Sequence, residues 1–358
     1  MKRERVVVAM SGGVDSAVAA ARCVAEGHEV IGISLRLARE GGHCCSLDDF
    51  HDARLVAERL GFPHYVFDES EAFSRDVIRP FVSEYLAGRT PNPCALCNQH
   101  VKFGVLWQRA RELGAARLAT GHYARTGIDQ ATGRASLRTA RDAAKDQTYF
   151  LFALGHADLA RTLFPVGELT KAEVRAEAAA LGLAVASKPE SMEVCFVTDG
   201  DAAGFVERQV AGDALRPGSI VDETGFEIGR HAGVHRFTVG QRRGLGVAGG
   251  ARRYVRALDA TTGTVTVGTA AGTARGLVAR TVSWVGGVAP ADGSELAVRI
   301  RHRHPMLPAR LSSAAGGVAH VAFATEGPAV TPGQAAVFYR GEIVLGGGWI
   351  AGELEVAA

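Results

Sequence analysis

Short apolar runs alternate with amphipathic helical patterns in the first part of the chain. The runs suit strands of a parallel sheet that is buried on both faces, and they lie at residues 6–10, 29–37 and 64–67. Helical patterns follow at 17–26 and, after the capping residue Ser46, up to about Leu60. This alternation predicts an α/β domain with a doubly wound parallel sheet, whose ligands bind outside the carboxyl ends of the strands.

The pattern changes at about Asp201, where short strand-like segments separated by Gly, Pro and Asp begin. We therefore predict an α/β catalytic domain over residues 1–201, a small central domain over 202–272 and a C-terminal β-barrel over 273–358. In the barrel, Arg299, Arg301 and Arg303 occupy alternate positions. On a strand they would form one basic face that is suited to phosphates of a nucleic acid.

A glycine-rich turn, Ser11-Gly12-Gly13-Val14-Asp15-Ser16, joins the first predicted strand to the first helix. Glycines let the backbone approach an anion closely, and the N–H groups of the new helix and the serine hydroxyls can donate to it. No Gly-Lys pair occurs in the chain, which disfavours a Walker loop. An ordinary strand-to-helix turn is the alternative, but two serines and an aspartate at this spacing favour a phosphate site.

Composition bears on the cellular compartment and on the state of the cysteines. The 358 residues contain no apolar run of about 18 residues, the length of a membrane span, and no signal peptide is recognisable at the start. We expect a cytoplasmic protein without membrane partners, in which cysteines act as catalytic, metal-binding or buried thiols rather than as a disulfide framework. The six cysteines are Cys23, Cys44, Cys45, Cys94, Cys97 and Cys195.

The glycine-rich turn resembles the PP-loop of the N-type ATP pyrophosphatases, which split ATP between its α and β phosphates. The resemblance implies that the turn holds pyrophosphate and that AMP is transferred to a substrate oxygen. Asp15 would carry Mg²⁺, because this hard cation prefers oxygen ligands when it bridges phosphates. The ATP-binding residues implied are Ala9, Met10, Ser11, Gly12, Gly13, Val14, Asp15, Ser16, Leu35 and Gly121.

A second informative segment runs from Pro91 to Asn98, with the sequence PNPCALCN. Its two prolines predict a stiff loop. Helical spacing from about Asn98 would place Cys97 at a helix N-terminus, where the dipole favours a thiolate.

Three further segments accompany it: KDQTYF at 145–150, KPESMEVCF at 188–196 and TVGQRRGLG at 238–246. Together these motifs resemble the tRNA-specific 2-thiouridylases of the MnmA family, which replace the C2 oxygen of the wobble uridine with sulfur.

This resemblance implies that the enzyme is a tRNA-uridine 2-sulfurtransferase. Cys195 would receive sulfur as a persulfide from a donor protein, a cysteine desulfurase or a relay protein. Cys97 would then release the sulfur and leave a Cys97–Cys195 disulfide. Contacts with the anticodon stem-loop are implied for Asn92, Pro93, Cys94, His122, Lys145, Asp146, Gln147, Arg301, His302 and Gln334.

Cys94 stands where many members of the family have an aspartate. The change creates a Cys94-x-x-Cys97 pair, and with Cys195 the three thiolates could instead hold a [4Fe–4S] cluster that delivers sulfide. Both sulfur routes stay open at this level. The remaining alternatives are another PP-loop enzyme that adenylates RNA and a noncatalytic RNA-binding iron–sulfur protein. The vicinal Cys44 and Cys45 have no assigned role.

Overall fold

The computed structural model describes residues 3–37, 46–130, 132–189, 194–247 and 252–355. Its first sheet is parallel, with strand order β3-β2-β1-β4-β7. The strands are β1 (Arg5–Ala9), β2 (Glu29–Arg36), β3 (His64–Asp68), β4 (Arg117–Ala119) and β7 (Thr162–Leu163). The three strands predicted from the apolar runs are confirmed.

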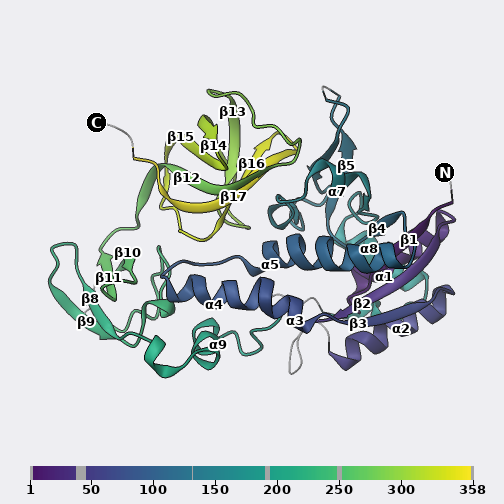
Figure 1. Ribbon diagram of the computed structural model, residues 1–358, viewed down its shortest axis with the longest axis horizontal. Coiled ribbons are helices and arrows are strands. Elements are labelled where there is room, and N and C mark those ends of the chain that lie inside the picture. The colour runs from purple at the N-terminus through teal and green to yellow at the C-terminus, as the bar shows by residue number, and fades with distance from the viewer. Residues whose placement is uncertain (1–2, 38–45, 131, 190–193, 248–251, 356–358) are drawn as a thin grey trace.

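Helices cover both faces of this sheet (Figure 1). Val6 and Val8 of β1 face a cluster with α1 (Val14–Ala25), α2 (Leu47–Leu60) and α8 (Lys171–Ala180). Val7, on the alternate face, packs with the helices on the other side. These are α3 (Ser70–Phe73), η1 (Ser74–Ile78), α4 (Arg79–Leu86), α5 (Pro93–Leu96), η2 (Cys97–Val105) and α6 (Leu106–Glu112). The predicted doubly wound fold is confirmed.

The helix that contains Cys97 begins earlier than the sequence pattern predicts. It starts at Pro93 and continues through the π-helical stretch η2 into α6. Asn92 caps it, since its Oδ1 accepts a hydrogen bond from the Ala95 N–H at 3.2 Å. Proline suits the first helical position because its missing N–H would have no intrahelical partner there. The predicted start at about Asn98 is therefore wrong, and Cys97 lies in the second turn.

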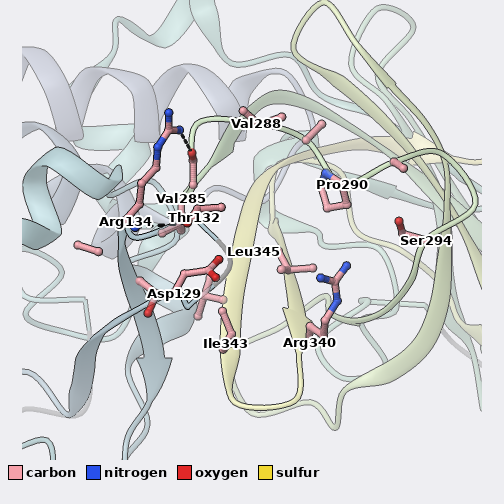
Figure 2. Close-up of a pocket in the computed structure, with 16 residues that line it drawn as sticks. Asp129, Thr132, Arg134, Val285, Val288, Pro290, Ser294, Arg340, Ile343 and Leu345 are labelled. Atoms are coloured by element: carbon pink, nitrogen blue, oxygen red, sulfur yellow. Dashed lines mark hydrogen bonds between the residues drawn. The ribbon is translucent and has the colours of Figure 1, made fainter.

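A hairpin from the α/β domain joins the barrel sheet. Its strands are β5 (Ala124–Ile128) and β6 (Ala135–Thr139), and β6 pairs with β17. A cavity of about 520 Å³ lies between this hairpin and the barrel. Figure 2 shows residues that line it, among them Arg134, whose guanidinium donates to the Gly286 carbonyl oxygen. None of the site residues predicted from the sequence lines this cavity. Short elements complete the domain: η3 (Thr148–Phe150), α7 (His156–Ala160) and η4 (Ala184–Ser187).

The rest of the chain forms a small sheet and a closed barrel. The small sheet has the order β10-β11-β8-β9, and its region contains α9 (Ala202–Gln209), η5 (Gly212–Ala214), β8 (Gly218–Val221), β9 (Glu227–His231), η6 (Val234–Arg236), β10 (Tyr254–Asp259) and β11 (Thr264–Gly268). Six strands form the barrel, which the β12–β17 pairing closes: β12 (Thr273–Trp284), β13 (Glu295–Arg299), β14 (Leu307–Ala315), β15 (Val318–Pro328), β16 (Ala335–Arg340) and β17 (Ile343–Glu353). The predicted barrel is confirmed.

The predicted arginine face of the barrel is wrong. β13 ends at Arg299, and the following residues form a turn in which the His304 N–H donates to the Arg301 carbonyl. Arg299 pairs with Asp146 of the α/β domain and its side chain is 15% exposed, whereas Arg303 is exposed. The buried Ile300 ends the strand pattern, so the three arginines do not share a face. No helix in the described part of the chain is long and apolar enough to cross a membrane.

Candidate nucleotide and thiol site

The loop after β1 has the geometry that anion binding requires. Gly12 has φ of +70°, and a Cβ there would lie 2.4 Å from the Asp49 carbonyl oxygen, so only glycine fits. The Ser16 hydroxyl accepts from the Ser11 N–H at 3.2 Å and donates to the Gly13 carbonyl at 2.9 Å. These bonds hold the loop closed at the N-terminus of α1, where backbone N–H groups and the helix dipole favour a phosphate.

A second glycine brings β4 to the same place. A Cβ on Gly121 would lie 2.6 Å from the Ser16 nitrogen, so the backbone after β4 packs directly against the start of α1. Because β1 lies between β2 and β4 while the chain runs from β1 to β2, the loops after β1 and β4 flank the point where strand order reverses. Ligands of doubly wound sheets bind at this point. Met10 and Leu35 are buried beneath it, and Ala9 is partly exposed.

Asp15 contacts a lysine that the sequence analysis did not assign to the site. The Lys171 ammonium donates to both carboxylate oxygens of Asp15, at 2.7 and 2.8 Å, and the Tyr123 hydroxyl donates to one of them at 2.8 Å. The Lys171 side chain is 12% exposed and that of Asp15 is 31% exposed. A positive charge absent from the loop itself is therefore supplied by the first residue of α8. Lysine scarcity was the available signal, since the chain has only five.

The three candidate cysteines differ in exposure. Cys94 is exposed, Cys97 is buried and Cys195 is intermediate. Cys97 belongs to the cluster between the sheet and the outer helices, and Cys195 packs against the same cluster. The next residue, Phe196, holds the Cys195 segment in place through ring contacts with Phe81 at 5.0 Å and with other rings of α3 and α9.

These three cysteines do not make a cluster site. Within the described ranges, no three His, Cys, Asp or Glu side chains are grouped so that they could hold a metal ion. Cys94 and Cys97 are three residues apart on one helix, yet one thiol is at the surface and the other is in the core. In this conformation the three thiols are therefore not arranged as the ligands of a [4Fe–4S] cluster. Cys44 and Cys45 lie outside the described residues.

Lys188 fastens the start of the Cys195 segment to α2. Its ammonium donates to Asp49 at 2.7 Å and to Asp52 at 2.5 Å. Burial lowers the pKa of Lys188, but the hydrogen bonds and charges of the two carboxylates outweigh burial and raise it. The Asp49 backbone also lies against Gly12, so the phosphate loop and the segment that leads to Cys195 share one support.

Among the predicted tRNA contacts, Asn92 and Gln334 are engaged with the loop before α5. The Gln334 amide donates to the carbonyls of Thr90 and Pro91 at 3.0 and 3.3 Å, which clamps the loop against the barrel. Asn92 and Pro93 are buried, and Cys94 is at the surface. Only Cys94 of these three is therefore displayed to a large substrate in this conformation.

The Lys145–Gln147 segment lies between the nucleotide loop and the barrel. The Gln147 side-chain oxygen accepts from the Tyr123 N–H at 2.9 Å, and Asp146 is buried. The His302 ring contacts the Asp146 carbonyl at 3.3 Å. Arg301 donates to the Thr331 hydroxyl at 2.8 Å, and Lys145 is half-buried.

His122 is buried, contrary to the expectation that it faces tRNA. Its Nδ1 lies 2.8 Å from the Thr120 hydroxyl, and its ring packs against both Phe103 and Phe164, with centroid distances of 6.1 and 6.2 Å. Burial, and secondarily the charge of Lys102, hold the pKa of His122 well below its usual value. The neutral ring packs in the core beside Gly121 rather than at a surface.

Comparison with known proteins agrees with this arrangement over almost the entire chain. Three family models match in succession: a tRNA methyl transferase HUP domain at residues 4–199, a tRNA methyl transferase PRC-barrel domain at 204–269 and an aminomethyltransferase β-barrel domain at 274–350. The tRNA-specific 2-thiouridylase MnmA of Geotalea uraniireducens is 52% identical, with 98% of this chain and 95% of that protein covered. That of Solibacter usitatus is 50% identical, with 98% and 100% covered. The chain belongs to the tRNA-specific 2-thiouridylase MnmA family.

Proposed function

We propose that this protein catalyses ATP-dependent 2-thiolation of the wobble uridine of tRNA. ATP would adenylate the uracil C2 oxygen and release pyrophosphate, and sulfur would then replace the adenylated oxygen and release AMP. The observation that carries the proposal is the meeting of the loop after β1, Gly121 and Lys171 around Asp15. Membership of the family supports tRNA as the substrate and sulfur as the transferred atom.

The phosphate end of ATP is bound by groups of this chain. The N–H groups that begin α1 point toward the loop, and the exposed Ser11 adds a hydroxyl donor. Lys171 can move from Asp15 to a phosphate oxygen, which places a positive charge where negative charge increases in the transition state. Asp15 would hold Mg²⁺, which neutralises the pyrophosphate leaving group when bound; one carboxylate together with phosphate oxygens is a set that this ion accepts.

Sulfur transfer uses two cysteines. A donor protein would convert the Cys195 thiol into a persulfide, whose terminal sulfur attacks the adenylated C2 and expels AMP. The Cys97 thiolate then attacks the Cys195 sulfur, the S–S bond to the transferred atom breaks, and its electron pair stays on the 2-thiouridine. A Cys97–Cys195 disulfide forms, and an external dithiol must reduce it with two electrons before the next cycle. The arrangement of both cysteines at one cluster supports this sequence.

The partners that this scheme requires are a tRNA with an accessible anticodon stem-loop and a persulfide-bearing donor. Both act in the cytoplasm, where thiols remain reduced. Cys94 at the surface beside the Asn92 cap supports approach of the target base to this end of α5.

Thiolation of a transcribed tRNA tests the proposal. The purified protein is incubated with ATP, Mg²⁺, a cysteine desulfurase and L-cysteine, and 2-thiouridine and AMP are measured by mass spectrometry. Wild type should form both, Asp15→Ala neither, and Cys195→Ser should retain adenylation, measured as ATP–pyrophosphate exchange, without thiolation. Full 2-thiouridine formation by either variant would contradict the corresponding role.

A further inference from the structure

A second cavity, of about 530 Å³, lies where α4 and the loop before α5 meet the barrel strands β12 and β17. These elements adjoin one another in Figure 1. Its polar and aromatic lining comes from Glu84, Arg89, Asn92, Arg280, Thr281 and Trp349. We propose that this cavity binds a ribonucleotide that neighbours the wobble uridine in the tRNA. This inference rests on the proposed function, since it names a further part of the same substrate.

The cavity is continuous with the loop expected to meet the target base. Pro91 and Asn92 line it, and the chain then passes directly to Pro93 and the exposed Cys94. Consecutive nucleotides of an anticodon loop lie next to one another along the strand. A uridine held at Cys94 therefore brings one of its neighbours to the loop that forms the cavity wall.

The lining residues suit an unpaired nucleotide. Single-stranded RNA is recognised by stacking of bases on aromatic rings or guanidinium planes and by charge pairing with its phosphates. The partly exposed Trp349 indole is held by an edge-to-face contact with Phe152 at 5.6 Å. A cavity of this volume is in the usual range for small-molecule sites, about 300–1,000 Å³.

The two arginines have different electrostatic surroundings. Glu84 binds Arg89 through two hydrogen bonds of 2.7 and 2.5 Å, which fixes the guanidinium plane and offsets its charge. Arg280 is exposed, and among the described residues it forms no ion pair. Arg280 is therefore the group available to a phosphate, whereas Arg89 offers an oriented plane.

Backbone strain occurs at the same wall. Thr281, which also lines the cavity, has φ of +51° and is the only described residue other than glycine with a positive φ. The β12–β17 register shifts between Arg280 and Ser283, so Thr281 lies in an irregularity of the barrel. A β-branched residue rarely adopts this conformation, and such strain concentrates at binding sites. Bulges of this kind redirect side chains out of the sheet, here at the cavity.

The test compares wild type with Trp349→Ala and Arg280→Gln, and Arg340→Gln is the control because Arg340 is another exposed barrel arginine, on β16. Binding of an anticodon stem-loop RNA is measured by fluorescence anisotropy. Trp349→Ala should raise the Kd about tenfold, as loss of one stacked base does. Arg280→Gln should raise Kd and reduce its salt dependence. RNA binding by Arg340→Gln should match wild type, and ATP–pyrophosphate exchange measured at saturating RNA should be unchanged in all three variants.

The decisive experiment uses a stem-loop RNA with an abasic residue beside the wobble uridine. If the cavity holds that base, its removal weakens binding to wild type about tenfold and leaves binding to Trp349→Ala unchanged. The proposal would be overturned if an abasic residue on either side of the uridine weakened RNA binding equally in wild type and in Trp349→Ala. It would also be overturned if free nucleoside monophosphates competed with an affinity equal to that of the RNA. If Trp349→Ala does not fold, Arg280→Gln with the abasic RNAs decides by the same comparison. Wild-type thiolation tests the proposed function separately, so the two failures are distinguishable.

Discussion

The Asp146 carboxylate and the Arg299 guanidinium form an ion pair of 3.1 Å that joins the α/β domain to the barrel. Their side chains are 3% and 15% exposed. Asp146 also accepts hydrogen bonds from the Thr148 hydroxyl at 2.8 Å and from the Ala140 N–H at 3.1 Å. A residue of the segment expected to touch tRNA is therefore occupied in holding two domains together.

Breaking this pair from one side should destabilise the protein strongly. Arg299→Ala leaves a buried carboxylate without its cationic partner, and we expect the free energy of unfolding to fall by about 3 kcal/mol. Urea denaturation followed by circular dichroism measures the change. The matched control is Arg54→Ala, which removes a pair with Glu58 whose side chains are 72% and 58% exposed; its effect should stay below about 1 kcal/mol. Similar losses in both variants would show that the buried pair has no special weight.

His122 should make stability depend on pH. Its folded-state pKa is lowered by burial, while in the unfolded chain the ring has a pKa of about 6.5. Below that pH the unfolded state binds a proton that the folded state does not, so stability falls as pH decreases. Urea denaturation between pH 7 and 5, a window that includes the unfolded-state pKa of about 6.5, should give a smaller decrease for His122→Gln than for wild type. Parallel curves would mean that His122 does not titrate on unfolding.

Local pattern predicted the first sheet well because each signal resides in neighbouring residues. The Ser46 hydroxyl accepts from the Asp49 N–H at 3.1 Å and the helix ends at Gly61 with φ of +77°, as the capping residues indicate. The start of the helix that contains Cys97 was misplaced because the two prolines were interpreted as part of a loop. Pro93 instead occupies the first helical position, where its ring is favourable.

Contacts between distant segments could not be predicted in the same way. Lys171 lies 156 residues from Asp15, and nothing in its local sequence, a helix start, distinguishes it from a solvated lysine. Arg299 was assigned to phosphate contact from its charge and spacing, and Asp146 to tRNA contact from the family resemblance; neither signal reveals that the two side chains are buried against each other. The pairing of β6 with β17 depends on how the domains dock, which no pattern within either segment encodes.

Lys171 should be required for adenylation. Lys171→Met removes the positive charge beside Asp15, and we expect ATP–pyrophosphate exchange to fall by about 10²–10³-fold, as for loss of one group that stabilises transition-state charge. The α8 capping box formed by Thr170 and Glu173 remains, so the melting temperature should change little. Lys171→Arg is the control that keeps the charge and should recover part of the activity. Normal exchange by Lys171→Met would restrict Lys171 to a structural ion pair.

Cys94 should be dispensable for sulfur transfer. Its thiol is exposed while that of Cys97 is buried, and no three ligands are grouped for a metal within the described parts of the chain. Cys94→Ser should therefore form 2-thiouridine at a rate within about threefold of wild type, a loss below roughly 1 kcal/mol, whereas Cys97→Ser and Cys195→Ser should form none. Iron and acid-labile sulfide are measured in the same preparations, purified without oxygen. Stoichiometric iron that disappears with Cys94→Ser, together with activity, would establish a three-cysteine cluster in place of the persulfide.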